Sequence, residues 1–334
     1  TNGNMPDMNQ GDRVTPERHH LWRWMIIGMA LLALALAVAL LFGRGSEGWY
    51  WAHGAQIDAL MPWRWPRVVA ALAAGMMLAV AGTMIQKLTG NPMASPEVLG
   101  ITSGAALGVL VLMLLVPGNA FVWLLPAGSL GAALTLLLVM ITSSRNGFSA
   151  QRMLLAGIAV STVFSTLVVM VLASGDPRTG MLLTWLAGST YGVDSAQALR
   201  TVGIAVVLIA ATPLCRRWLM LLPLGSVTAK AVGVALMPSR VAILLIASAL
   251  TAAATLMTGP LSFVGLMAPH MARMLGFKRA MPQLMVAALI GGFLMMFADW
   301  CGRMVMFPYQ IPAGLLATFI GAPYFIFLLR KQGK

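Results

Sequence analysis

Long apolar runs, separated by short polar stretches, are the main feature of the chain. A helix needs about 20 mostly apolar residues to cross the hydrocarbon core of a bilayer. The runs therefore predict an all-α polytopic membrane protein with ten transmembrane helices. The predicted spans cover residues 22–42, 67–85, 98–116, 121–141, 153–173, 201–214, 241–257, 261–275, 283–301 and 312–329.

The count of ten depends on the short run 261–275, which contains Pro269. Without this span, Arg330 and Lys331 would face the outside, against the tendency of basic residues to lie in cytoplasmic segments. We therefore expect ten spans with both termini in the cytoplasm. The run 201–214 is also short and is expected to extend backward along the chain.

Basic residues are unevenly divided between the two sides of this predicted topology. With both termini inside, 16 of the 22 lysines and arginines fall in inner segments. The six outside are Arg44, Arg64, Arg67, Arg178, Arg200 and Arg303. The formal net charge of +13 thus follows from membrane orientation and does not require a nucleic-acid partner.

Composition narrows the class of protein further. Only 9% of the residues are charged and 59% are hydrophobic, whereas a soluble domain carries roughly 25% charged residues. A soluble enzyme, a disordered chain, a disulfide scaffold and a collagen-like fibre are therefore excluded. Cys215 and Cys301 lie far apart and match no metal-ligand or redox spacing, and nothing in the sequence argues for a disulfide between them.

Acidic residues are scarce inside the predicted spans. Only Asp299 falls within one, near its outer end and four residues before Arg303, so an i,i+4 ion pair is expected. Ion-coupled transporters usually carry ionisable residues at membrane depth, and the scarcity of acids argues against this class. No phosphate-cradling G-x-x-x-x-G-K-[ST] motif occurs, so energy for any pumping must come from a partner.

The first 20 residues are polar and match neither a signal peptide nor a transit peptide. We expect residues 1–20 to form a tail or linker. Because the chain starts with Thr1 rather than Met, it is expected to be a piece of a longer protein.

Small residues recur within the predicted spans at a spacing of four. Gly104 and Gly108 form one such pair, and Gly128 and Ala132 form another. This spacing lets helix backbones approach closely in lipid, so tight helix packing is expected at these positions.

The predicted inner loop 215–240 is too long for a tight turn. Within it, residues 224–233 predict a short helix, with Ser226 as the N-cap and Gly233 as the stop. Such a helix suits a docking site for a soluble partner and, equally well, an interfacial helix that lies on lipid headgroups.

Three blocks of sequence carry a resemblance to a known family. The first starts with Arg64–Trp65–Pro66–Arg67 and continues through residues 81–82 and 86–108, the second covers 224–233, and the third comprises 259–270, 298–299, 312–314 and 321–323. In these blocks the chain resembles the permeases of binding-protein-dependent ABC importers for iron-siderophores, haem and vitamin B12. The resemblance covers residues 22–334 and is strongest to the C-terminal half of fused ferric-hydroxamate permeases.

The resemblance implies a ten-helix type II ABC importer permease over residues 21–334, located in the bacterial inner membrane. It implies transport rather than catalysis, here of an iron(III)-hydroxamate siderophore by alternating access. The implied partners are a second permease unit, two ATPase subunits that bind ATP and Mg²⁺, and a periplasmic siderophore-binding protein. This chain is expected to bind no cofactor itself. A cobalamin or haem permease of the same family, and an ion-coupled secondary transporter of a different class, remain as alternatives.

The resemblance also assigns residues that couple the permease to the ATPase. These form the coupling helices at about residues 225–236, with Gly225, Ser226, Ala229 and Gly233 as the contact positions. Many family members carry an acid where this chain has Ser226, so one ATPase contact is expected to be weaker or to come from the other permease unit.

Two further groups of residues follow from the resemblance. Arg64, Arg67 and Arg303 are expected to dock the acidic surface of the binding protein, although Arg64 and Arg67 could equally be interfacial anchors beside neighbouring tryptophans. The candidate gate residues lie after the fifth predicted span and are Trp185, Ser189 and Tyr191. They are expected to form either a gate of the transport path or a re-entrant segment with an aromatic anchor.

Overall fold

The computed structural model describes residues 15–116, 121–144, 149–177, 179–261 and 263–332. These residues form a helical bundle with one short antiparallel hairpin. The elements are α1 (Thr15–Leu41), β1 (Phe42–Gly45), β2 (Gly48–Trp51), α2 (Ala55–Thr89), η1 (Glu97–Leu99), α3 (Ile101–Leu115), α4 (Phe121–Ser144), α5 (Ala150–Ala173), α6 (Thr179–Leu186), α7 (Ser195–Ala211), η2 (Thr212–Cys215), α8 (Arg216–Leu221), η3 (Leu222–Leu224), α9 (Ser226–Ala231), α10 (Leu236–Thr258), α11 (Val264–Met274), α12 (Ala280–Met304) and α13 (Ala313–Gln332).

Each predicted span contains a helix, but the described residues do not supply ten full-length spans. Seven described helices are long and apolar enough to cross a membrane, whereas α3 and the stretch Ala313–Phe327 of α13 are shorter. Helix α11 has 11 residues, a length of about 16 Å, which is too short for a hydrocarbon core of about 30 Å. The count of ten spans therefore stays a prediction, while α7 begins at Ser195 and confirms the backward extension of the sixth span.

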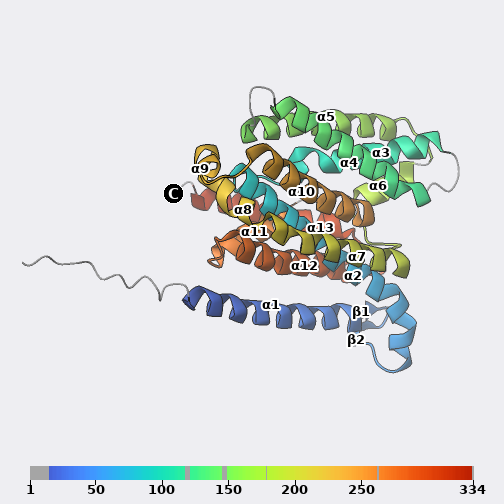
Figure 1. Ribbon diagram of the computed structural model, residues 1–334. Coiled ribbons are helices and arrows are strands. Elements are labelled where there is room, and N and C mark those ends of the chain that lie inside the picture. Colours follow the sequence, from blue (N-terminus) through green and yellow to red (C-terminus); the bar gives the residue numbers. More distant parts are fainter. Residues whose placement is uncertain (1–14, 117–120, 145–148, 178, 262, 333–334) are drawn as a thin grey trace, which may run out of the picture.

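The start of the chain is more regular than the sequence suggested. Helix α1 begins at Thr15, so the described part of the expected tail is helical, and residues 1–14 lie outside the described residues, as do Arg145, Arg178 and Lys334. Helix α2 does not begin after the proline-rich stretch but runs through Pro62 and Pro66. Both prolines lie in its first 12 residues, where Figure 1 shows the helix changing direction before it enters the bundle.

The hairpin β1–β2 was not predicted, because two strands of four residues are too short to give a clear alternating pattern. Phe42 pairs with Trp51 and Gly45 with Gly48. Figure 1 places this hairpin at one end of the bundle, and α9 at the other end together with the start of α1 and the end of α13. We call these two ends the hairpin end and the α9 end.

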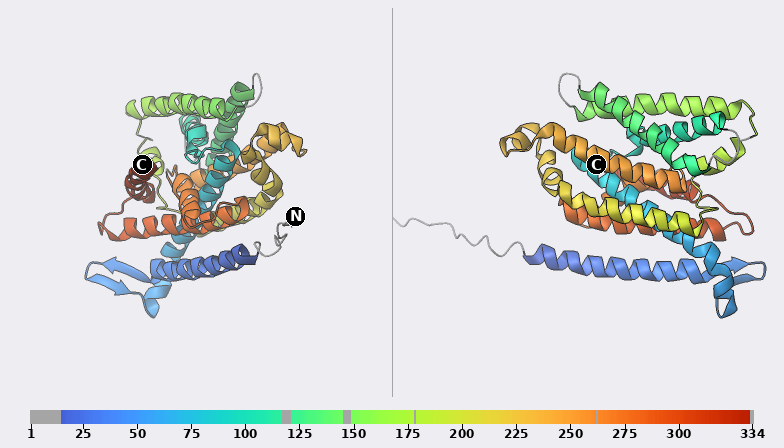
Figure 2. Two further views of the ribbon diagram at one scale, coloured as in Figure 1. Left: turned by 90° about the vertical axis from the view of Figure 1, so that its left-hand side faces the viewer. Right: turned by 45° about the vertical axis from the view of Figure 1, so that its right-hand side comes forward.

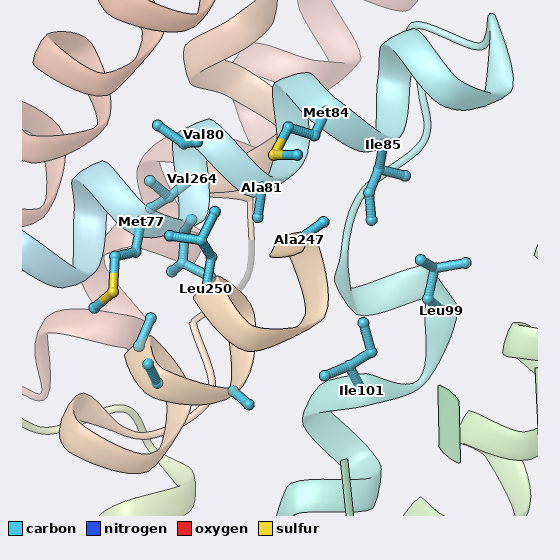
Figure 3. Packing of buried hydrophobic residues seen from close by; sticks show 14 of the residues in the cluster. Met77, Val80, Ala81, Met84, Ile85, Leu99, Ile101, Ala247, Leu250 and Val264 are labelled. Carbon is cyan, nitrogen blue, oxygen red and sulfur yellow. The ribbon is translucent and has the colours of Figure 1, made fainter. Parts of the chain in front are cut away.

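Helix α2 is the central element of the bundle. It packs against α7, α10, α11 and α12, and 83% of its most apolar stretch is buried, against 6% for α1. Figure 2 shows α1 along one flank and α3, α4 and α5 along the other. Figure 3 shows Met77, Val80 and Ala81 of α2 beside Leu250 of α10 in the main apolar core.

Glycines allow α2 to touch its neighbours backbone to backbone. A Cβ atom at Gly82 would lie 1.8 Å from the carbonyl oxygen of Gly265 in α11, and one at Gly75 would lie 2.2 Å from that of Gly291 in α12. The predicted tight packing at Gly104 is confirmed, because a Cβ atom at Gly131 of α4 would lie 2.0 Å from the carbonyl oxygen of Gly104.

We predict that Gly82→Ala destabilises the protein by about 1–3 kcal/mol, because the added methyl group must displace the backbone of α11. The measurement is thermal unfolding of the detergent-solubilised protein. The matched control is Gly203→Ala in α7, where an added Cβ meets nothing within 4 Å. Alanine is intrinsically better than glycine in a helix, so the control should be neutral or stabilising, and equal melting temperatures for both variants would contradict the packing argument.

Candidate functional site

An ionic cluster lies at the hairpin end, around the fully buried side chain of Asp299. Arg303 Nε contacts one carboxylate oxygen at 3.1 Å, which confirms the predicted i,i+4 pair on α12. Arg67 Nη2 of α2 lies 3.3 Å from the other oxygen, and Thr190 Oγ1 donates a hydrogen bond to that same oxygen. One carboxylate thus joins α2, α12 and the loop that follows α6.

Two of the three predicted docking arginines also bind the end of α1. Arg303 Nη2 donates to the carbonyl oxygen of Ala39 at 3.1 Å, and Arg64 Nη1 donates to that of Leu40 at 2.9 Å. The last carbonyl groups of a helix lack partners within the helix and carry partial negative charge, so both cations stabilise this helix end. Arg64 also donates to the hydroxyl of Tyr50 in the hairpin at 2.7 Å. Each arginine is only 7% exposed.

The side chain of Arg67 is slightly more accessible, with 12% of it exposed. Its Nη1 donates to Oε1 of Gln310 at 2.6 Å, and its guanidinium lies 5.7 Å from the ring centroid of Tyr191, which is 68% exposed. The structure therefore brings Arg64, Arg67 and Arg303 together, and places the gate candidate Tyr191 over one of them.

The cluster carries an excess of positive charge, since it holds three guanidinium groups and one carboxylate, which contacts Arg67 and Arg303. Within the described residues, Arg67 Nε and Arg303 Nη1 are buried and have no hydrogen-bond partner. A surface of this kind attracts acidic groups and speeds their encounter.

Close to this cluster, three interruptions between helices meet. They separate α6 from α7, α10 from α11, and α12 from α13. The amide of Gly314 donates to the carbonyl oxygen of Gly188 at 2.9 Å, and a Cβ at Gly259 would lie 2.1 Å from the carbonyl oxygen of Trp185. Non-helical backbone at membrane depth is tolerated where protein covers it, and these segments cover one another.

The two remaining gate candidates differ in their surroundings. Trp185 packs against the apolar cluster of α3, α5 and α6, whereas Ser189 Oγ accepts a hydrogen bond from the amide of Tyr191 at 3.1 Å. Phe263, next to this junction, has a φ of 72°. A bulky side chain in the left-handed region stores strain, which often accompanies segments that change conformation.

The predicted helix in the loop 215–240 is present as α9, and its end is confirmed. Gly233 has a φ of 81°, its amide donates to Lys230 at 3.0 Å, and the amide of Val234 donates to Ala229 at 3.0 Å. These two bonds form a Schellman motif, in which glycine is favoured at the left-handed position.

The beginning of α9 differs from the prediction. Gly225 is the N-cap, with a φ of 100°, and no side chain caps the helix. Ser226 is instead the first helical residue, and its Oγ accepts a hydrogen bond from Arg240 of α10 at 2.7 Å. The expectation that Ser226 is the N-cap was therefore wrong, because its hydroxyl binds the next helix.

Helix α9 protrudes from the bundle. Ala229 is fully buried against the core, while Val227 on the opposite side is 85% exposed. Helix α10 begins at Leu236, so the predicted coupling region 225–236 consists of α9 and the turn that leads into α10. An exposed apolar side chain on a short, anchored helix is suited to contact with another protein.

Several residues of the site escaped the sequence analysis. Tyr50, Thr190 and Gln310 all bind the arginine cluster, but they lie in segments far apart along the chain. Their polar character in a predicted outer segment was the only available signal. Among the residues that the structure describes, no group of three His, Cys, Asp or Glu could hold a metal ion, and both cysteines are free.

Comparison with known proteins gives a consistent result. Residues 25–331 match the sequence model of the FecCD transport family. The chain is 64% identical to the iron(3+)-hydroxamate import system permease protein FhuB of Escherichia coli K12, over 98% of this chain and 50% of FhuB. It is 37% identical to the ferric enterobactin transport system permease protein FepG of the same strain, over 81% of this chain and 82% of FepG. The chain spans about half the length of the FhuB proteins that it matches.

A solved structure has the same architecture. An inward-facing conformation of a metal-chelate type ABC transporter superposes with a TM-score of 0.82 and 27% sequence identity. The match covers 93% of this chain and 99% of that chain, so the arrangement of helices described above is that of an ABC transporter permease.

We predict that Asp299→Asn destabilises the protein by about 3 kcal/mol, because the substitution leaves two buried guanidinium groups without a counterion. Thermal unfolding in detergent measures the change. Asp58→Asn on α2 is the control, since Asp58 is exposed and should contribute less than about 1 kcal/mol. A melting temperature for Asp299→Asn equal to that of the control would show that the cluster does not depend on this carboxylate.

Proposed function

The chain belongs to the FecCD transport family, and we propose that it is one permease unit of an ATP-driven importer of iron(III)-hydroxamate siderophores. The observation that carries the proposal is the 64% identity to FhuB over 98% of this chain. The importer would lie in the bacterial inner membrane, with both termini of this chain in the cytoplasm. That orientation places the α9 end inside and the hairpin end outside.

This function requires three kinds of partner. A second permease unit would complete the central path, because this chain spans about half of the FhuB proteins. Two cytoplasmic ATPase subunits would bind ATP and Mg²⁺, since this sequence holds no phosphate-binding motif of the Walker type. A periplasmic binding protein would deliver the siderophore.

We assign the ATPase contact to α9. Its exposed apolar face and its short connection to α10 support this role, with Gly225, Ser226, Ala229 and Gly233 as the positions that shape it. Because Ser226 is held by Arg240, a movement of α9 would be passed directly to α10. The interfacial alternative is less favoured, since α9 protrudes at the end of the bundle (Figure 1) and its Val227 is 85% exposed.

We assign the binding-protein contact to the arginine cluster. Arg67 is the best placed of the three for a direct contact, because Arg64 and Arg303 are more deeply buried and hold the end of α1. Arg64 and Arg303 would contribute mainly through their charge. An acidic side chain of the binding protein would then compete with Asp299 for Arg67.

Transport would proceed by alternating access between two packings of similar energy. Trp185, Ser189 and Tyr191 lie where the helix interruptions meet the arginine cluster, which supports a role for this segment as a gate. ATP binding and hydrolysis in the ATPase would then act through α9 and α10, and docking at Arg67 would act on α2, which packs against α10.

The alternatives are less well supported. A cobalamin permease of the family is represented among the relatives at 32% identity, half the value found for FhuB. An ion-coupled secondary transporter would need a titratable acid in the membrane, and Asp299 is already engaged by two arginines.

Uptake into proteoliposomes tests the function. The complete permease, the ATPase and the binding protein are reconstituted, and radioiron-labelled hydroxamate siderophore is supplied outside. We expect uptake that requires internal ATP and that excess cobalamin or haem does not inhibit. Uptake driven by an ion gradient without ATP would overturn the proposal, and transport of cobalamin instead would identify the alternative permease.

Gly233→Arg should reduce ATP-driven uptake in this assay by roughly tenfold, because a side chain in the left-handed position costs about 1–2 kcal/mol and distorts the end of α9. Gly276→Arg is the matched control. Gly276 ends α11 in the same kind of motif, with a φ of 98° and open space around it. Normal uptake by Gly233→Arg, or equal loss in both variants, would count against a specific role of α9.

Arg67→Gln should weaken binding of the periplasmic protein by about 30-fold, the effect of losing roughly 2 kcal/mol from a charged contact. Titration of the binding protein onto the reconstituted permease measures this change. Arg200→Gln is the control, since Arg200 is exposed and lies in the first two turns of α7, which starts at the hairpin end (Figure 1). An unchanged dissociation constant for Arg67→Gln would place the docking surface elsewhere.

A further inference from the structure

A cavity of 950 Å³ lies at the α9 end, between α1, α8 and the start of α12. It belongs neither to the arginine cluster nor to α9. Its walls combine two kinds of side chain, which occupy different elements. The α1 side is apolar, whereas basic residues come from the end of α2, from α8 and from the segment that leads into α12.

Four cations line this cavity: Lys87, Arg216, Lys278 and Arg279. No aspartate or glutamate is among its lining residues. Lys87 Nζ donates to the carbonyl oxygen of Lys278 at 2.7 Å, which holds the end of α2 next to the segment before α12. The positive charge of these side chains favours an anion in the space that they line.

The beginning of α12 adds to the positive potential. Arg279 occupies its N-cap position, and its side chain makes no capping hydrogen bond. Ala280 and Met281, the first two helical residues, line the cavity. Their amide groups and the partial positive charge of a 25-residue helix favour an anion at this point, in addition to the four side chains.

The rest of the wall is suited to hydrocarbon. Trp22, Ile26 and Met29 of α1 and Met285 of α12 line the cavity and are at least partly exposed. Only 6% of the most apolar stretch of α1 is buried, and the helix runs along one flank of the bundle (Figure 2). The apolar wall follows α1 from its first turns toward the middle of its apolar stretch, as an acyl chain would.

We propose that this cavity binds an anionic phospholipid of the phosphatidylglycerol type. The headgroup phosphate lies among Lys87, Arg216, Lys278 and Arg279, and one acyl chain runs along Ile26 and Met29. Basic pockets between transmembrane helices on the cytoplasmic side are suited to such headgroups. A free phosphate ion would satisfy the cations but would leave the apolar wall uncovered, which is why we assign a lipid.

The bound lipid would fasten α1 to the bundle at this end. At the hairpin end, Arg64 and Arg303 already hold the last carbonyl groups of α1. At the α9 end, the cavity separates the first turns of α1 from α8, so the lipid would fill a space that protein does not. This inference depends on membrane insertion and not on which cargo is carried.

Native mass spectrometry of the intact permease complex tests the proposal. The complex is taken from membranes with equal amounts of phosphatidylglycerol and phosphatidylethanolamine, and the retained lipid is identified. We expect preferential retention of phosphatidylglycerol, with retention lowered about fivefold for each charge removed in Lys278→Gln and Arg216→Gln. Arg23→Gln is the matched control, because Arg23 lies on the same turn of α1 as Trp22 but does not line the cavity.

Three results would overturn the proposal. Equal retention of the two lipids by the wild-type complex would show that the cavity has no preference for the anionic headgroup, whatever the variants do. Displacement of the signal by millimolar inorganic phosphate would identify a free-anion site instead. A loss in Arg23→Gln as large as in Lys278→Gln would indicate nonspecific attraction to the whole basic end rather than a built site.

Discussion

The close contact of α2 with α11 and α12 is the constraint on which the rest of the structure depends. Lipid offers no hydrophobic driving force between helices, so association relies on close packing. Gly75 and Gly82 let the backbone of α2 touch two neighbours at once, and the apolar residues on its other sides meet α7 and α10. Because α2 also carries Arg64 and Arg67, the packing that builds the core fixes the position of the ionic cluster as well.

The ionic cluster shows how one group can serve both stability and recognition. Asp299 is the counterion that stabilises the buried guanidinium groups of Arg67 and Arg303. Its single negative charge leaves the cluster with a net positive charge that an acidic partner can bind. Arg64 and Arg303 hold the end of α1, and Arg67 contacts Thr190 in the loop after α6. The proposed docking site and the fold therefore use the same charges, and a substitution at one of them has to be checked for both effects.

The sequence predicted those features that depend on nearby residues. Apolar runs predicted where the helices lie, a spacing of four predicted the pair of Asp299 with Arg303, and Gly233 predicted the end of α9. The features that were missed depend on residues far apart in the chain. Arg64 binds Tyr50 only because a short hairpin folds back over α2, and Ser226 binds Arg240 rather than its own helix end. No local pattern contains that information.

Helix α10 has a mechanical consequence for the protein. It has 23 residues and a length of about 35 Å, and its proline, Pro238, lies in the first turn, where no intrahelical hydrogen bond is lost. One end is tied to α9 through Arg240, and the other ends at Gly259, in contact with the backbone of Trp185 and Gly188. A regular helix of this length does not shorten or bend easily, so a displacement of its first turn would be passed to its far end. In the proposed importer, α10 would connect the two faces of the membrane as a single stiff element.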